Sequence, residues 1–289
     1  MIGRATMSTV SATDSMAMTV PCPLMDRADA PRVLMVVPTL GQRTDYLAHT
    51  LQSIREQGVP VDITVVCPSS AKEARSMARG AGASIVDDPG SLPAAINLGM
   101  ASVDDHEYVA WLGDDDLLEP QSLDWTTSAL DRDPAAVLAY GWCRYINPDG
   151  RQLWINKTGK VAEAVLAWGP QLIPQPGMLV RRKAWEAVGG LDESLTMAFD
   201  FDLILKLRRV GSLTSVDRTV SAFRWHPQSL TVSSRSRNFQ ESELVKRRYL
   251  QPWQRRLAWS WERPVRLATR LAAWNVNRKA QSIMAGSRT

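Results

Sequence analysis

Cysteine is scarce in this sequence. Its 289 residues include three cysteines, Cys22, Cys67 and Cys143, an odd number with no pair at C-x-x-C spacing. This pattern argues against a disulfide framework or a zinc module and is typical of a reducing compartment. Internal repeats are absent, and no apolar stretch reaches the roughly 18 residues that a membrane-spanning helix needs. The first residues also lack the apolar core of a signal peptide. We therefore expect a cytoplasmic protein.

Positive charge is concentrated in the last part of the chain. The net charge is +4, yet residues 246–289 contain eleven Lys or Arg and one acidic residue, together with four of the eleven tryptophans. Trp and Leu beside Arg and Lys are typical of an amphipathic helix at a membrane surface. We expect residues 231–289 to form a helical extension that binds an anionic membrane surface, at the inner face of the plasma membrane. Packing of these helices on the domain is the alternative, and nucleic acid is the least favoured partner.

The first half of the chain alternates between short apolar runs and amphipathic segments. Residues 1–30 show no sustained periodicity, and we expect them to form a disordered leader. From there the pattern predicts strands at 31–37, 61–66, 83–86 and 108–112, separated by helices at 44–57, 71–79 and 92–101. This order, with short connections, predicts an α/β fold with a mostly parallel sheet and helices on both faces.

The second half is less regular. Its apolar runs predict strands at 136–144, 152–156 and 220–225, and residues 174–180 are expected to form a loop that leads into a further strand. Helices are expected at 163–168, 183–188 and 199–210, and a loop at 233–237 precedes the helices of the extension.

An acidic turn follows the fourth predicted strand. Three carboxylates, Asp114, Asp115 and Asp116, stand where that strand ends, and ligands of open α/β sheets bind at this edge. Pro120 suits the first turn of a following helix. The residues alone leave two interpretations open: a solvated turn with an Asp as helix N-cap, or a divalent-cation site built from hard oxygen ligands.

Several segments, taken in order, resemble the family 2 glycosyltransferases of GT-A fold. They are Val36-Val37-Pro38-Thr39 with Arg43 and Leu51-Gln52-Ser53-Ile54; Ala95-Ile96-Asn97-Leu98-Gly99; Leu112–Pro120; Gly177–Arg182 with Val188–Glu193; Asp200-Phe201-Asp202-Leu203 with Leu207-Arg208; and His226. A DxD-like triplet alone is a weak signal, whereas the ordered set covers about residues 31–230. The resemblance implies a GT-A glycosyltransferase domain over that range.

The resemblance also implies a nucleotide-diphosphosugar donor with Mn²⁺ or Mg²⁺ on its two phosphates. A carboxylate-held cation of this kind neutralises the charge that develops on a diphosphate leaving group. Asp115 matches the metal-binding carboxylate of the family and Asp114 the neighbour near the ribose, and the resemblance implies Asp116 as a further metal ligand.

His226 matches a position where some members place another metal ligand or a phosphate contact. A structural loop histidine is the equally weighted alternative, and Arg224 or Arg235 would then be the candidates for the phosphates.

Transfer requires a base that takes the proton of the attacking hydroxyl. The resemblance implies an in-line, inverting displacement with Asp200 as this base. An N-cap role is the alternative for Asp200, and Asp202 is then the candidate base.

Further residues match the nucleotide side of the donor site. Pro38, Thr39 and Arg43 match the edge that holds the donor base and phosphates. Asn97 matches a residue that holds a loop near the donor, with plain helix packing as the alternative.

Three positions depart from the family pattern. Gly113 stands where many members have an Asp, and Phe199 stands where an acidic residue usually precedes the base. Cys67-Pro68 replaces an Asp that contacts the nucleobase or ribose in most members, and Asp88 is a candidate substitute.

The sequence as a whole predicts an inverting, divalent-metal-dependent glycosyltransferase with a hydroxyl acceptor, a lipid-linked or cell-envelope glycan. A sugar-phosphate nucleotidyltransferase and a non-catalytic carbohydrate- or partner-binding relic are the alternatives.

Overall fold

A computed structural model describes residues 31–260, with gaps at 158, 160–161, 164–165, 167–170, 227–228, 230–234 and 258–259. The leader expected at 1–30, most of the helix expected at 163–168 and the tail beyond residue 260 lie outside the described residues.

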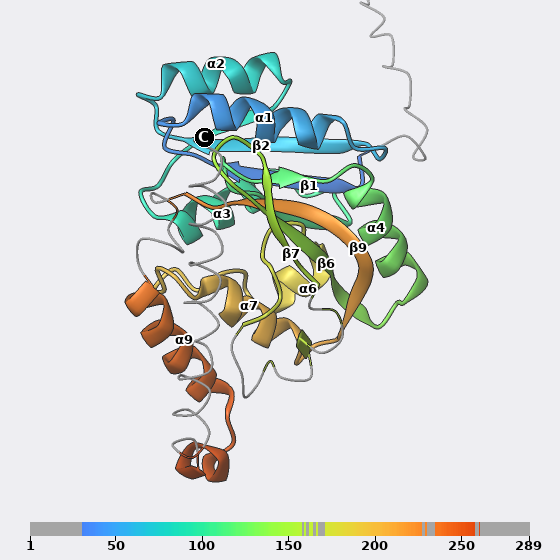
Figure 1. The fold of residues 1–289 in the computed structure, drawn as a ribbon, viewed down its shortest axis with the longest axis vertical. Coiled ribbons are helices and arrows are strands. Elements are labelled where there is room, and N and C mark those ends of the chain that lie inside the picture. The colour runs from blue at the N-terminus through green and yellow to red at the C-terminus, as the bar shows by residue number, and fades with distance from the viewer. Residues whose placement is uncertain are drawn as a thin grey trace, which may run out of the picture. The chain divides into compact units, whose positions relative to one another are not determined.

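The described strands form one mixed sheet, shown in Figure 1. They are β1 (Val33–Pro38), β2 (Val61–Cys67), β3 (Ser84–Asp87), β4 (Tyr108–Trp111), β5 (Leu117–Leu118), β6 (Ala136–Ile146), β7 (Gln152–Asn156), β8 (Leu179–Arg181) and β9 (Ser212–Arg224). Their order is β3-β2-β1-β4-β8-β6-β9-β5, and β7 pairs with β6. The first four strands are parallel neighbours, as predicted, whereas β8 runs antiparallel to both β4 and β6. The strand β8 therefore joins two differently built halves of the sheet.

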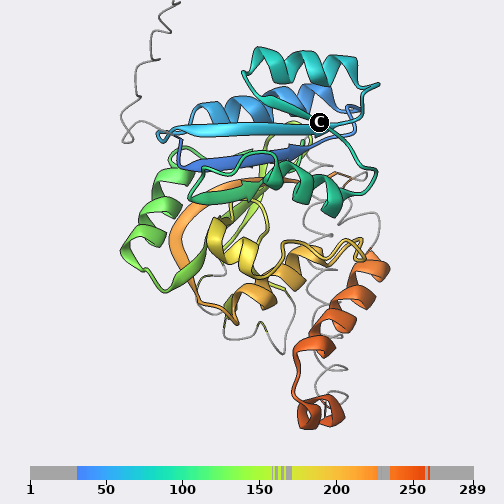
Figure 2. The same cartoon turned by 180° about the vertical axis from the view of Figure 1, so that it is seen from behind.

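Helices cover both faces of the sheet, as the sequence predicts (Figure 2). They are α1 (Thr44–Arg55), α2 (Lys72–Gly80), α3 (Leu92–Ala101), α4 (Ser122–Arg132), α6 (Arg182–Ala187), α7 (Phe199–Leu207) and α9 (Arg235–Tyr249). Alternate residues of β1 enter two separate cores because neighbouring side chains of a strand point to opposite faces. Val33, Met35 and Val37 pack with α1, α2 and α4, and Leu34 and Val36 pack with α3, α6 and α7.

The segment after the acidic turn differs from the prediction. Pro120 does not begin a helix. Leu117 and Leu118 first form β5, which pairs antiparallel with Ala222 and Ser221 of β9, and α4 begins only at Ser122. The three carboxylates thus stand between two strands, so none of them is a helix cap. The physical reason is the edge of β9, which offers Leu117 and Leu118 hydrogen-bond partners that the local sequence does not reveal.

Further boundaries differ from the prediction. The strand β9 begins at Ser212, eight residues before the expected start, because it runs parallel to β6 over most of the length of both strands. The loop expected at 233–237 is in part the start of α9, which begins at Arg235. The helix α7 ends at Leu207 rather than at 210.

The described part of the C-terminal extension packs on the domain. Val245 of α9 is fully buried in the core that contains α7. Beyond α9, Trp253 and Leu257 are exposed on the surface, at 59% and 49%. None of the helices within the described residues is both long and apolar enough to cross a bilayer.

Candidate active site

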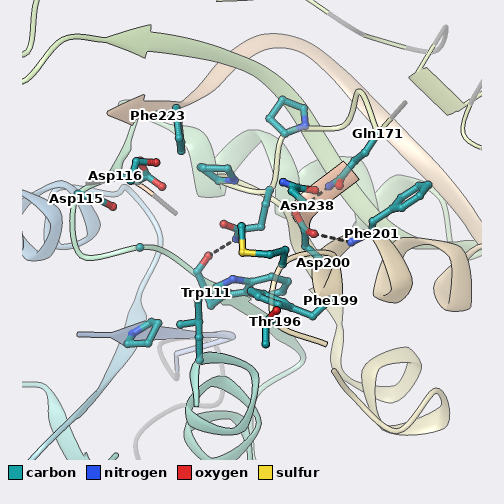
Figure 3. A pocket seen from close by; sticks show the side chains of 18 of the residues that line it. Trp111, Asp115, Asp116, Gln171, Thr196, Phe199, Asp200, Phe201, Phe223 and Asn238 are labelled. Carbon is teal, nitrogen blue, oxygen red and sulfur yellow. Dashed lines mark hydrogen bonds between the residues drawn. The ribbon is translucent and has the colours of Figure 1, made fainter. Parts of the chain in front are cut away.

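A cavity of about 1770 Å³ opens where β1 and β4 end. This is the sheet edge at which α/β folds bind ligands. The predicted site residues on its wall are Pro38, Thr39, Arg43, Asp114, Asp115, Asp116 and Asp200. Figure 3 shows Asp115 and Asp116 together on one side of the cavity and Asp200 apart from them, beside Gln171 and Phe201.

Asp114 ties the acidic turn to the loop after β1. Thr39 donates a 2.6 Å hydrogen bond from Oγ1 to one carboxylate oxygen of Asp114, and Arg43 donates one of 2.5 Å to the other. Burial raises the pKa of Asp114 above its usual range, although the bond from Thr39 and the charge of Arg43 oppose this shift. Both oxygens of Asp114 are therefore engaged within the protein, and the loop is fixed against the turn.

Asp115 is the carboxylate that links the turn to the end of β9. His226 Nε2 lies 2.8 Å from Asp115 Oδ2, and Arg43 Nη1 lies 3.2 Å from the same oxygen. Burial alone would lower the pKa of Arg43, but the charges of Asp115 and Asp114 raise it. Arg43 thus stays cationic and neutralises part of the negative charge of the turn.

Asp116 is enclosed about as deeply as Asp114, with 5% of the residue exposed against 4% for Asp114. The backbone N–H of Arg224 donates a 3.0 Å bond to its Oδ1, and Thr50 Oγ1 donates a 2.8 Å bond to its backbone carbonyl. Burial, followed by the charge of Asp115, raises the pKa of Asp116 well above its usual range. A buried carboxylate of this kind is stabilised when a cation approaches it.

The two oxygens without a protein partner face the same space. Asp115 Oδ1 and Asp116 Oδ2 have no hydrogen-bond partner within the described residues. They would lie 3.0 and 3.2 Å from a Cβ placed on Gly113. A side chain at 113 would crowd both oxygens, so the glycine keeps the space between them open. Free carboxylate oxygens around an open space are a donor set that suits Mn²⁺ or Mg²⁺. No group of three or more metal-binding side chains is already assembled around one point among the described residues.

Asp200 is the second residue of α7 and lines the other end of the cavity. Gln171 Nε2 donates a 2.8 Å bond to its Oδ2, and the backbone N–H of Phe201 donates a 2.7 Å bond to its Oδ1. Figure 3 shows both contacts. Burial raises the pKa of Asp200, and the bonds from Gln171 and Phe201 oppose the shift. A half-buried carboxylate of raised pKa beside a cavity is a candidate general base.

Comparison with known proteins identifies the family. The model of the family described as "Glycosyltransferase like family 2" matches residues 31–240. The chain belongs to this glycosyltransferase family.

Relatives by sequence agree with this assignment. An uncharacterized glycosyltransferase of Rickettsia typhi is 25% identical over 195 residues, which are 64% of this chain and 61% of that protein. A chondroitin synthase of Pasteurella multocida is 26% identical over 117 residues, which are 38% of this chain and 11% of that enzyme. The chain thus spans about three fifths of the first relative and about a tenth of the second.

Solved structures show that the fold is the GT-A fold. A mannosyltransferase from Pyrobaculum calidifontis in complex with GDP-Man and Mn²⁺ superposes with a TM-score of 0.60 at 18% identity, covering 90% of this chain and 76% of that one. Residues 1–349 of S. aureus TarS in complex with UDP-GlcNAc superpose with a TM-score of 0.57 at 13% identity, covering 74% of this chain and 65% of that one.

Several residues that the family resemblance singled out lie outside the cavity wall. Asn97 fastens α3 to the segment before α7, because it bonds both backbone groups of Leu191, at 3.0 Å each, and donates to Glu193 at 2.9 Å. His226 is buried against Asp115 and reaches the site through that carboxylate. Cys67 is completely buried in the core, whereas Asp88 lies on the cavity wall.

The contacts of this glycosyltransferase disfavour two alternative assignments, Arg224 as a phosphate contact and Asp202 as the base. Arg224 holds the acidic turn with a 3.0 Å bond to the carbonyl of Asp115, and its guanidinium lies 4.4 Å from the centre of the Tyr46 ring. It is 3% exposed and thus has little access to donor phosphates. Asp202 is fully buried, where it accepts a 2.8 Å bond from Tyr249, so it does not face the cavity. The side chain of Arg235 lies outside the described residues.

The structure adds residues that sequence reasoning missed. Gln171 contacts Asp200, and Gln175 donates a 2.9 Å bond to the carbonyl of Trp111 at the end of β4. Neither glutamine stands in a pattern that marks it from sequence. The helix α9 also lines the cavity, through Asn238, Phe239, Ser242, Glu243, Lys246 and Arg247. From sequence, the basic composition of the extension predicts a membrane surface as its partner and does not indicate that α9 lines a cavity.

An aromatic wall closes the cavity beside the acidic turn. It consists of Tyr145, Phe223 and Trp225, which line the cavity, and Trp154, which stacks on Tyr145 at 4.3 Å between ring centres. Trp225 packs against Trp154 at 5.6 Å. Large flat apolar surfaces with few polar groups are suited to a bound organic ligand.

Proposed function

We propose that this protein is an inverting, divalent-metal-dependent glycosyltransferase. It moves a sugar from a nucleotide-diphosphosugar to a hydroxyl acceptor, a lipid-linked or cell-envelope glycan. The donor class is supported by two structural neighbours, which hold UDP-GlcNAc and GDP-Man.

One observation carries the proposal. A single cavity contains a carboxylate pair with two free oxygens at one end and Asp200, a carboxylate of raised pKa, at the other. Inverting transfer requires these two functions on opposite sides of the reacting sugar carbon, because the leaving group departs on one side and the hydroxyl attacks from the other. Figure 3 shows the carboxylate pair and Asp200 apart from each other in the same cavity, which supports the proposal.

Each residue has a defined task in this scheme. Asp115 and Asp116 would hold a divalent cation, which supplies the positive charge that a diphosphate leaving group needs. Arg43 contacts Asp114 and Asp115 of the same turn and remains cationic, so it would add a second positive charge near the phosphates. Asp200 accepts the proton of the acceptor hydroxyl as that oxygen attacks the sugar carbon. Gln171 and the backbone N–H of Phe201 each donate a bond to one oxygen of Asp200 and so orient the carboxylate.

The acceptor and the membrane are proposed from two surfaces. The aromatic wall provides an apolar surface inside the cavity for an organic acceptor. Trp253 and Leu257 are exposed beside Arg255 and Arg256, a combination that suits the surface of an anionic membrane. A peripheral position on the membrane would give the enzyme access to a lipid-linked acceptor.

The test is a donor screen with matched variants. Nucleotide-sugars are incubated with the full chain, with Mn²⁺, with Mg²⁺ and with a chelator, and release of nucleoside diphosphate is measured. We expect metal-dependent release by the wild type, loss in Asp115→Ala, and loss of sugar transfer in Asp200→Asn with donor binding retained. Full activity in the chelator would contradict the metal assignment, and full transfer by Asp200→Asn would contradict the base. Release of pyrophosphate from a nucleoside triphosphate and sugar phosphate would indicate a nucleotidyltransferase instead.

A further inference from the structure

The segment that carries Asp200 lacks a local cap. The helix α7 begins at Phe199, and its N-cap residue is Ala198, whose side chain can accept no hydrogen bond. The first amides of a helix have no partner within the helix, and Ser, Thr, Asp or Asn at the N-cap usually satisfies one of them. The amide of Ala198 at the N-cap and those of Thr196 and Met197 just before it lie ahead of the first turn of α7, so the helix itself offers none of them an acceptor.

Glu241 of α9 supplies that acceptor. Its Oε2 accepts bonds from the backbone N–H groups of Thr196, Met197 and Ala198, at 3.1, 2.7 and 3.1 Å. Its Oε1 accepts a 2.5 Å bond from the hydroxyl of Thr196. Burial alone would raise the pKa of Glu241, but the bonds from the turn lower it, so the carboxylate stays ionised. Charged acceptors of this kind form the stronger class of hydrogen bonds.

The rest of α9 is fastened independently of Glu241. Arg248 donates a 2.6 Å bond to Asp192, and Tyr249 donates a 2.8 Å bond to Asp202. Val245 lies in the core between these points and Glu241. Loss of the Glu241 carboxylate would therefore free the turn before Asp200 without detaching the helix.

We propose that Glu241 is a positioning residue for the base, and that α9 is a functional part of the transfer site. By holding three consecutive amides, Glu241 fixes where α7 begins and so where Asp200 stands relative to the sugar carbon. This inference rests on the proposed function, because it assigns Glu241 to the geometry of the same transfer step. Misplacement of a reacting group by about 1 Å can cost about 100-fold in rate.

The test compares Glu241→Ala and Glu241→Gln with Arg248→Gln, in the full chain. Arg248→Gln is the matched control, because it removes the ion pairs of α9 with Asp192 and with Asp202 of α7 but none of the bonds to the turn at Thr196–Ala198. We expect Glu241→Ala to lower kcat for transfer by about 10- to 100-fold while KM for the donor stays within about threefold. Glu241→Gln keeps the size of the side chain and one acceptor oxygen, so we expect it to recover part of kcat. Arg248→Gln should keep kcat close to that of the wild type.

A second measurement is independent of activity. Hydrogen exchange at the amides of residues 196–198 should accelerate at least tenfold in Glu241→Ala and stay unchanged in Arg248→Gln. Unchanged exchange in Glu241→Ala would overturn the inference. An equal loss of kcat in Glu241→Ala and Arg248→Gln would also overturn it. Absence of transfer by the wild type with every donor counts against the proposed function, and the exchange comparison then still decides whether Glu241 holds the turn.

Discussion

Replacement of Asp116 by Asn tests two expected properties of the acidic turn: repulsion between its carboxylates without metal, and binding of a divalent cation. The distances from Gly113 place Asp115 Oδ1 and Asp116 Oδ2 within about 6 Å of each other, where two like charges repel by about 3 kcal/mol at an effective dielectric constant of about 20. The substitution removes one of these charges. Its amide oxygen can still accept the bond from the N–H of Arg224, so the backbone contact remains. The metal-free variant should thus be more stable than the wild type by about 1–3 kcal/mol, which is a rise in Tm of about 2–10 °C.

The same substitution should abolish the response to metal. A ligand that binds only the folded state stabilises it by about 2.7 kcal/mol at a hundredfold excess over its Kd, so Mn²⁺ should raise the Tm of the wild type. The variant lacks one of the two carboxylates that face the open space, and its Tm should not change with Mn²⁺. Thermal unfolding with and without Mn²⁺, in a chelator-washed sample, measures both effects.

Asp114→Asn is the matched control in the same turn. Both oxygens of Asp114 already accept bonds from Thr39 and Arg43, so this variant leaves a buried partner unsatisfied and should lose about 1–3 kcal/mol. Without metal, Asp116→Asn should therefore raise the free energy of unfolding, whereas Asp114→Asn should lower it. If Asp116→Asn were less stable than the wild type without metal, and still gained stability from Mn²⁺, then the carboxylate pair would not be the cation site.

Three further predictions concern the base, the glycine and the tail. Asp200 acts in its ionised form and burial raises its pKa, so kcat should fall on the acid side of its pH profile at a higher pH than for an ordinary carboxylate. Gln171→Ala removes a bond that favours the ionised form, so it should move this acid limb of the kcat profile to still higher pH. Gly113→Ala places a Cβ against the two free carboxylate oxygens and should weaken Mn²⁺ activation about tenfold or more, with a change in stability below about 1.5 kcal/mol, as measured by metal titration and thermal unfolding. Sedimentation with anionic liposomes should fall with rising salt and should be reduced in Trp253→Ser with Leu257→Ser, and absence of binding by the wild type at low salt would contradict membrane association.

The start of the fold could be predicted because β1 and β2 are apolar runs, each with a helix after it. Val33–Pro38 and Val61–Cys67 are buried on both faces and contain few polar residues, so their pattern needs no knowledge of their partners. The start of β9 could not be predicted in this way. Its residues 212–219 are mostly polar, and they form a strand because β6 offers a parallel edge beside them. Two-residue β5 was missed for the same reason.

The residues of the candidate site likewise fall into two groups, those that the sequence could predict and those that it could not. Asp114–Asp116 and Asp200 could be picked out because the resemblance marks them, and the structure places all four on one cavity wall. Gln171 and Glu241 could not be picked out, because a single Gln or Glu in a polar segment has no local pattern. Their importance arises only when the chain brings them to Asp200 and to the turn before it.

The contacts of the acidic turn also bear on the order of folding. Its partners Thr39, Arg224 and His226 are separated from it by 75, 108 and 111 residues along the chain. Contacts between such distant residues form slowly, because a long loop must close before they contribute. During synthesis, three adjacent carboxylates therefore emerge well before β9 can hold them. We therefore expect the acidic turn to be one of the last parts of this domain to assemble, and chains that stop before His226 to keep the turn open to solvent.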